Sequence, residues 1–179
     1  MKSRAALTLM VLLLLAVPIS HLQLQQVDQR WLLAVDGRQL DVAGQWSDSL
    51  NRWLRDCSLV RVVPAQEGTH AQVVKAIGQY SPPDSQELRL SGLWQKDDWL
   101  LAEVDFTRLA PAVVVLWHQQ GAWEVHTSGV WSGSTHPHWP ASFIRQYLGR
   151  KVPQVPPDLL ACFDPSPTLF QRAGTRPES

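Results

Sequence analysis

The stretch "ELRLSGLWQKDDWLLAEVDFTRLAPAVVVLWHQQGAWEVHTSGVW", residues Glu87–Trp131, decides the fold. It holds four runs rich in leucine, valine and tryptophan, separated by the short segments QKDD, TRLA and QQG. Connections this short join antiparallel neighbours, because parallel strands need a crossover of a dozen or more residues. The stretch therefore predicts a four-stranded antiparallel meander.

Alternation along the four runs predicts one apolar and one mixed face of this sheet. A three-residue loop, 119–121, would place Trp117 opposite Trp123. Helices are the available cover for the apolar face. Its predicted members are Leu88, Leu90, Trp94, Leu100, Ala102, Val104, Phe106, Val113, Val115, Trp117, Trp123, Val125 and Thr127.

The segments on either side of the meander read mainly as helices. Apolar residues recur at helical spacing from Trp46 to Cys57, and a second helix follows with Thr69 as its N-cap. After the meander, Pro140 opens a helix, and a short last helix carries Cys162. Near the start, Asp36–Gly37 separates two apolar runs and predicts a small β-hairpin, 30–42. The predicted class is α+β.

This order, a helix followed by an antiparallel meander, is similar to cystatin-like and nuclear-transport-factor-2-like folds, in which a curved sheet wraps a helix. The resemblance covers about Ala43–Trp131 and concerns element order alone. It implies no site residues and no activity, because one fold hosts many functions. The small N-terminal hairpin and the proline-rich C-terminal helices depart from either pattern.

The N-terminus has the layout of an export signal. Lys2 and Arg4 precede an apolar run, Ala5–Val17, which Pro18 ends. A cleaved signal peptide and an uncleaved membrane anchor both fit residues 1–20, and both place the body outside the cytoplasm, in the periplasm, secreted or held at the inner membrane. We expect one globular domain over residues 21–165 and a flexible tail over residues 166–179.

Export changes the interpretation of the two cysteines, Cys57 and Cys162. In an oxidising compartment a disulfide is the expected state, and two buried free thiols are the alternative. Their spacing fits neither a CxxC redox motif nor a zinc knuckle. A bond between them would join the first helix to the last short one.

Composition excludes some classes of function. The 16 basic and 16 acidic residues cancel, so no overall charge attracts nucleic acid. Walker, Rossmann and HExxH patterns are absent from the sequence, and no cofactor is expected.

His136 and His138 flank Pro137 just before a helix start, and we interpret them as a solvated turn rather than a metal site, because zinc takes three or four ligands.

The sequence favours a non-enzymatic extracytoplasmic binding or accessory domain that engages an envelope protein or a small ligand. The alternative is a small hydrolase or ligand-sequestering protein that uses the mixed sheet face, where His126 lies with Glu103 and Glu124. Nine tryptophans suit an aromatic binding surface as well as a core. The candidate binding residues are Trp99, Glu103, Glu124, His126 and His118.

Overall fold

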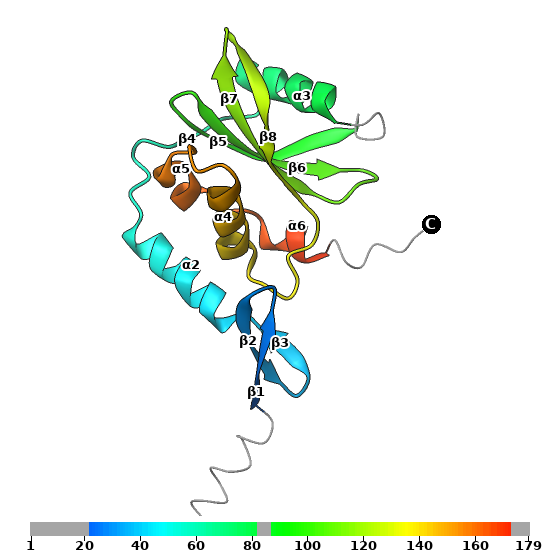
Figure 1. Ribbon diagram of the computed structural model, residues 1–179. Helices are drawn as coiled ribbons and strands as arrows, with labels where there is room; N and C mark the ends of the chain where they lie inside the picture. The colour runs from blue at the N-terminus through cyan, green and yellow to red at the C-terminus, as the bar shows by residue number, and fades with distance from the viewer. Residues whose placement is uncertain (1–21, 82–86, 173–179) are drawn as a thin grey trace, which may run out of the picture.

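The computed structural model describes residues 22–81 and 87–172, and within these it is an α+β protein with two antiparallel sheets and five helices (Figure 1). The first sheet has three strands, β1 (Leu22–Val27), β2 (Arg30–Val35) and β3 (Arg38–Leu40). The second has five strands: β4 (Arg61–Val62), β5 (Leu88–Lys96), β6 (Trp99–Phe106), β7 (Ala112–Gln119) and β8 (Ala122–Ser132). The helices are α2 (Val42–Leu54), α3 (Gly68–Tyr80), α4 (Pro140–Lys151), α5 (Pro157–Cys162) and α6 (Pro167–Arg172).

The small sheet is built from two tight turns. The predicted Asp36–Gly37 turn joins β2 to β3, and both residues have positive φ, 49° and 78°, as a type I′ hairpin turn requires. The first strand, β1, was not predicted; it pairs with β2 through a second turn at Asp28 and Gln29, also with positive φ. Neither turn residue there is glycine, so the usual signal for such a turn is missing.

The predicted meander forms, but the sheet has five strands instead of four. Strands β5 to β8 are neighbours in chain order and pair antiparallel throughout. The short strand β4 adds to the free edge of β5, where Val62 is the partner of Trp94. A two-residue strand carries no alternation, and so its pairing could not be read from the sequence.

The predicted facing of β7 is wrong by one residue. The β7–β8 turn consists of two residues, Gln120 and Gly121, both with positive φ, instead of the three expected. His118 is consequently the partner of Trp123, and Trp117 is the partner of Glu124. Because side chains alternate along a strand, this single step moves Trp117 to the opposite face of the sheet from Trp123.

A bulge in β5 moves a second tryptophan. The register shifts between Leu90 and Gly92, so that Leu93 pairs with Ala102 and Trp94 pairs with Leu101. One extra residue in a strand reverses the facing of all that follow it. Trp94 therefore lies on the opposite face from Leu90, where the sequence analysis had placed both together.

Both faces of the large sheet are covered, so the predicted mixed face is instead a second core (Figure 1). Helix α3 packs Val73 and Ile77 on one face, over Leu100, Val104 and other apolar side chains. Helices α4, α5 and α6 cover the other face. The buried members of this second core are Leu101, Val113, Val115, Trp131, Ile144, Leu148, Val152, Val155, Leu159, Phe163 and Phe170.

The folded part extends beyond residue 165, where a flexible tail was expected. Helix α6 places Phe170 in the second core with its side chain fully buried, 5.4 Å from the ring of Trp131. The backbone N–H of Thr135 donates to the carbonyl of Phe170. Proline-rich composition suggested a tail, but one buried phenylalanine anchors the segment. Residues 173–179, and the predicted signal or anchor at residues 1–20, lie outside the described residues.

The structure contains the predicted disulfide. Cys57 follows α2 and Cys162 ends α5, and the bond joins Cα atoms 5.7 Å apart across 105 positions of sequence. Such a bond fits an oxidising, extracytoplasmic location. No helix within residues 22–81 and 87–172 is long and apolar enough to cross a membrane.

Candidate interaction surface

Three of the five predicted binding residues gather on one part of the sheet. Trp99 and His126 meet at Trp117, whose ring lies 5.9 Å from that of Trp99 and 5.1 Å from that of His126. Glu124 is the strand partner of Trp117, so it shares their face. Each of the three rings is half-buried, so they form a packed aromatic cluster instead of an open site.

The other two predicted residues lie elsewhere. His118 stacks edge-on against Trp123 on the opposite face, with ring centroids 5.0 Å apart. Glu103 lies on the same strand as Trp99 but four residues away, about 13 Å along the strand. Its side chain is buried and accepts a hydrogen bond of 3.0 Å from the backbone N–H of Ser166. The arrangement therefore separates Glu103 from His126.

Burial raises the pKa of the Glu103 carboxyl above its ordinary value; the hydrogen bond from Ser166 opposes the shift, and the charge of Asp105 adds to it. The folded state then binds the proton more tightly than the unfolded state does. As a result, the free energy of unfolding falls as pH rises from the ordinary glutamate pKa through the raised folded value. The ionised carboxylate of Glu103 therefore lowers the free energy of unfolding at neutral pH.

We expect Glu103→Gln to be more stable than the unmodified protein at pH 7 and to lose this decline with pH. The amide oxygen of glutamine still accepts from Ser166, and it carries no charge to bury. Urea unfolding between about pH 4 and pH 7 measures the difference. Glu124→Gln, at an exposed position, is the control and should change stability by less than about 0.5 kcal/mol. A Glu103→Gln protein that is less stable at pH 7 would contradict this account.

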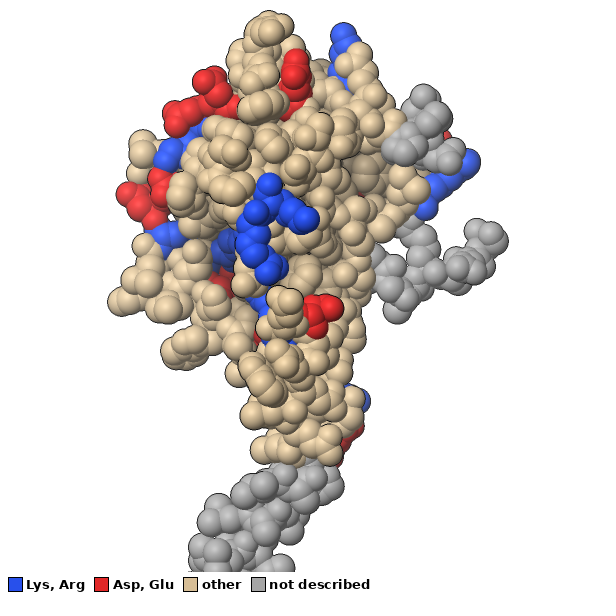
Figure 2. Space-filling model, viewed as in Figure 1, with Lys and Arg blue, Asp and Glu red and all other residues tan. Residues whose placement is uncertain are grey.

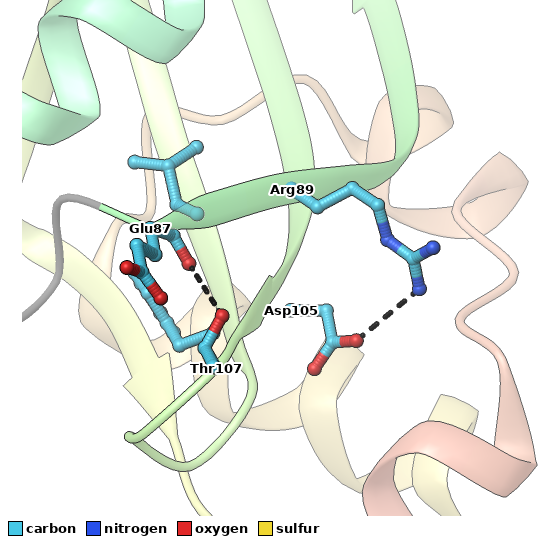
Figure 3. A pocket seen from close by; sticks show the side chains of 6 residues that line it. Glu87, Arg89, Asp105 and Thr107 are labelled. Atoms are coloured by element: carbon cyan, nitrogen blue, oxygen red, sulfur yellow. Dashed lines mark hydrogen bonds and ion pairs between the residues drawn. The ribbon is translucent and has the colours of Figure 1, made fainter.

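A shallow pocket lies where β5 begins and β6 ends (Figure 3). It has a volume of about 400 Å³, and some of its polar groups bind one another. Arg89 pairs with Asp105 at 3.4 Å, and the Thr107 hydroxyl donates to the carbonyl of Glu87 at 3.4 Å. Among the described residues, its lining holds one hydroxyl, that of Thr107, and two carboxylates, those of Glu87 and Asp105, but no histidine or cysteine.

The segment His136–Pro137–His138 forms the predicted turn before α4, but it is not solvated throughout. His136 is exposed, whereas His138 is only 2% exposed and stacks on Phe143 with ring centroids 4.9 Å apart. The Nε2 atom of His138 lies 3.2 Å from a carboxylate oxygen of Asp28 in the β1–β2 turn. His138 therefore joins α4 to the small sheet. Among the described residues, no cluster of three or more metal-ligating side chains occurs.

The two histidines should consequently differ in their effects on stability. We expect His138→Ala to lower the free energy of unfolding by about 1–3 kcal/mol, because it removes a buried ring and its hydrogen bond. His136→Ala should change it by less than about 0.5 kcal/mol. Thermal unfolding of the two single variants makes the comparison, and equal melting temperatures would show that the turn is solvated as the sequence suggested.

Helix α2 buries its polar side. Asp48 is 1% exposed and accepts three hydrogen bonds, from Arg52 at 2.7 Å, from the indole N–H of Trp139 at 2.9 Å and from Arg145. Burial lowers the pKa of Arg145, and the charge and hydrogen bond of Asp48 act in the opposite direction. A carboxylate this buried is stable only with such partners.

Further polar contacts hold the two ends of α2 against the body. Asp41 is the N-cap; it accepts from the backbone N–H groups of Gly44 and Trp139, each at 2.8 Å. Near the other end, the carbonyl of Ala161 in α5 accepts from Asn51 at 2.8 Å and from Arg55 at 3.2 Å. The polar side of α2 is therefore the side that faces α4 and α5.

The apolar side of α2 faces outward as a result. We call Trp46, Leu50, Trp53 and Leu54 the α2 apolar face; they recur at positions i, i+4, i+7 and i+8, and Trp46 and Trp53 are 73% and 81% exposed. The surface over α2 and the three-stranded sheet is largely uncharged in Figure 2. Single exposed apolar residues are ordinary, but a contiguous stripe marks an interaction site.

Exposed apolar side chains are concentrated in this part of the described chain. Ten of the thirteen large hydrophobic residues that are exposed lie between Leu22 and Leu59, and only Val62, Tyr80 and Leu109 lie beyond. The helical stripe was predicted from the sequence but was expected to pack inward, and none of the four residues was predicted to bind a partner. The pattern of alternating polar and apolar sides could have located the stripe; nothing local indicated its direction.

Searches of the chain against protein-family models, curated proteins and solved structures find no match.

Proposed function

We propose that this protein is a non-enzymatic, extracytoplasmic binding or accessory domain of the cell envelope, and that it works by docking through the α2 apolar face. One observation carries the proposal: a stable, disulfide-tied helix holds two tryptophans at 73% and 81% exposure. Large aromatic side chains are enriched at the energetic centres of interfaces. Tryptophan side chains exposed to solvent do not stabilise the folded state.

The polar contacts and the disulfide around α2 keep the α2 apolar face exposed. The N-cap contacts of Asp41, the buried Asp48 and the disulfide after residue 54 each orient the helix with the same side outward. Preorganisation of this kind lowers the entropy lost on binding. The face is an exposed side of a helix, so it suits an extended surface of an envelope component better than it suits a small ligand, and the neutral net charge gives no reason to expect nucleic acid.

Export remains part of this proposal. The apolar run Ala5–Val17 after Lys2 and Arg4 is typical of a signal peptide or an anchor, and the disulfide suits the compartment to which either would lead. We also propose that the stretch of about Ala43–Trp131 is similar in element order, helix and then antiparallel meander, to cystatin-like and nuclear-transport-factor-2-like folds. That likeness supplies no function.

The alternative, an enzyme that uses the sheet face of His126, has less support. Glu103 is buried under α6 and about 13 Å from Trp99 in the cluster, so it does not form an acid–base pair with His126. His126 itself is half-buried against Trp99 and Trp117.

Site-specific photocrosslinking in living cells tests the binding role. We expect a benzoylphenylalanine placed at position 46 or 53 of the full chain to form adducts with envelope components on irradiation. The same amino acid at Gln72, an exposed residue of α3, is the matched control and should form at least about tenfold fewer. Adduct yields at positions 46 and 53 that equal the yield at position 72 would contradict the proposal.

A further inference from the structure

We propose that the α2 apolar face lies on the surface of a lipid bilayer, directly beside the point where the apolar run Ala5–Val17 enters that bilayer. This inference rests on the proposed function, because it names the surface that the same face contacts. It treats the run as an anchor that remains attached, one of the two interpretations that its sequence permits.

The length of chain between the run and the folded body restricts where α2 can lie. The run ends at Val17 and β1 begins at Leu22, which leaves five Cα steps, about 18 Å at full extension. A body tied so closely to a bilayer keeps its first elements near the headgroups. The elements concerned are β1, β2, β3 and α2: the three strands lie at the lower end of Figure 1, and α2 begins beside them and runs up the left side of the body.

The exposed apolar residues lie in those same elements. Besides the four residues of the α2 apolar face, the small sheet exposes Leu24 at 70% and Trp31 at 60%. The exposed face of this sheet is set by strand pairing: Leu33 on the central strand is the partner of both Leu24 and Leu40. Apolar exposure is therefore greatest in the part of the body nearest to the proposed anchor.

The chemistry of α2 suits the interfacial region of a bilayer. Its polar side is buried against the body and its apolar side is exposed, and an amphipathic helix of this kind lies in the plane of the interface. Tryptophan is the residue enriched at that depth, since its ring is apolar and its N–H finds a partner among the headgroups. The one carboxylate in α2, Asp48, is buried, and Arg52 is its one basic residue, so α2 itself presents no exposed acid to a membrane.

Photocrosslinking in a defined bilayer tests the lipid assignment. The full chain, with benzoylphenylalanine at position 50, is reconstituted in nanodiscs of phosphatidylethanolamine and phosphatidylglycerol and irradiated. Mass spectrometry of the α2 peptide should show phospholipid adducts, at least about tenfold above those formed by the same amino acid at Gln72 in α3. A second protein carries the same label at position 50 together with Trp46→Ser and Trp53→Ser. It should form at least about tenfold fewer lipid adducts, because it lacks two interfacial side chains.

The outcomes separate this inference from the proposed function. Adducts to a second copy of the chain or to the nanodisc scaffold, without lipid, would overturn the lipid assignment, as would a Trp46→Ser/Trp53→Ser protein that keeps its full lipid yield. If lipid adducts fail here while the label at position 53 still captures an envelope component in cells, the docking role stands and only its lipid partner is wrong. Failure at both steps would overturn both.

Discussion

Replacing Cys57 with serine should lower the free energy of unfolding by about 4–5 kcal/mol. The bond to Cys162 closes a loop of 105 positions, and in the chain-entropy model a loop of that size restricts the unfolded chain by about this amount. A whole domain is stable by only about 5–15 kcal/mol, so the change is a large fraction of the total. Urea unfolding of the full chain, folded under oxidising conditions, measures it.

The double variant Cys57→Ser/Cys162→Ser is the control for this result. Its stability should match that of the single variant, because each removes the same bond, and treatment of the unmodified protein with a thiol reductant should reproduce both. Loss of the bond also releases the segment after α2, so hydrogen exchange in that segment should rise more than in α3. Full stability after reduction would show that the covalent link contributes nothing to the fold.

Replacing Asp48 with alanine should cost about 3–5 kcal/mol. The carboxylate is 1% exposed, and its removal leaves the Arg145 guanidinium, itself largely buried, without its charge partner. It also leaves the indole N–H of Trp139 without an acceptor. Asp105→Ala is the matched control: its partner Arg89 is 80% exposed, and pairs of that kind contribute about 0–1 kcal/mol.

A double-mutant cycle separates the value of the pair from the cost of breaking it. Asp48→Leu/Arg145→Met replaces both charges with apolar side chains of similar size, and it should recover most of the stability that either single change loses. Two single variants that lose less than about 1 kcal/mol each would contradict the account of α2 given above, since the helix would then be held by something other than its buried polar side.

Local chemistry was enough to predict several elements. Asp36 and Gly37 tolerate positive φ, so the hairpin they form follows from two residues. The period of the apolar residues predicted α2 and α3, although α3 begins one residue before Thr69, with Glu67 as its N-cap and no side-chain capping bond. The disulfide followed from the count of two cysteines and the expected compartment, and no geometry was needed.

Features that depend on one residue of register escaped prediction. The β7–β8 turn, Gln120–Gly121, was read one residue too long, and the bulge between Leu90 and Gly92 has no apolar signature. Each error reverses which side chains share a face. The candidate site failed for a different reason: helices α4, α5 and α6 cover the face assigned as mixed, so it holds a second core in which Glu103 is buried.

The sequence by itself determined that the stretch around Trp46–Trp53 forms a helix with one polar and one apolar side, which the structure bounds at Val42 and Leu54. Only the tertiary structure decided which side is buried, because the partners that stabilise the polar side lie far along the chain. Arg145 stands 97 positions from Asp48, and the carbonyl of Ala161 stands 110 positions from Asn51. Helical periodicity is a property of neighbours in sequence, whereas the burial of a charge depends on the groups that the fold brings to it.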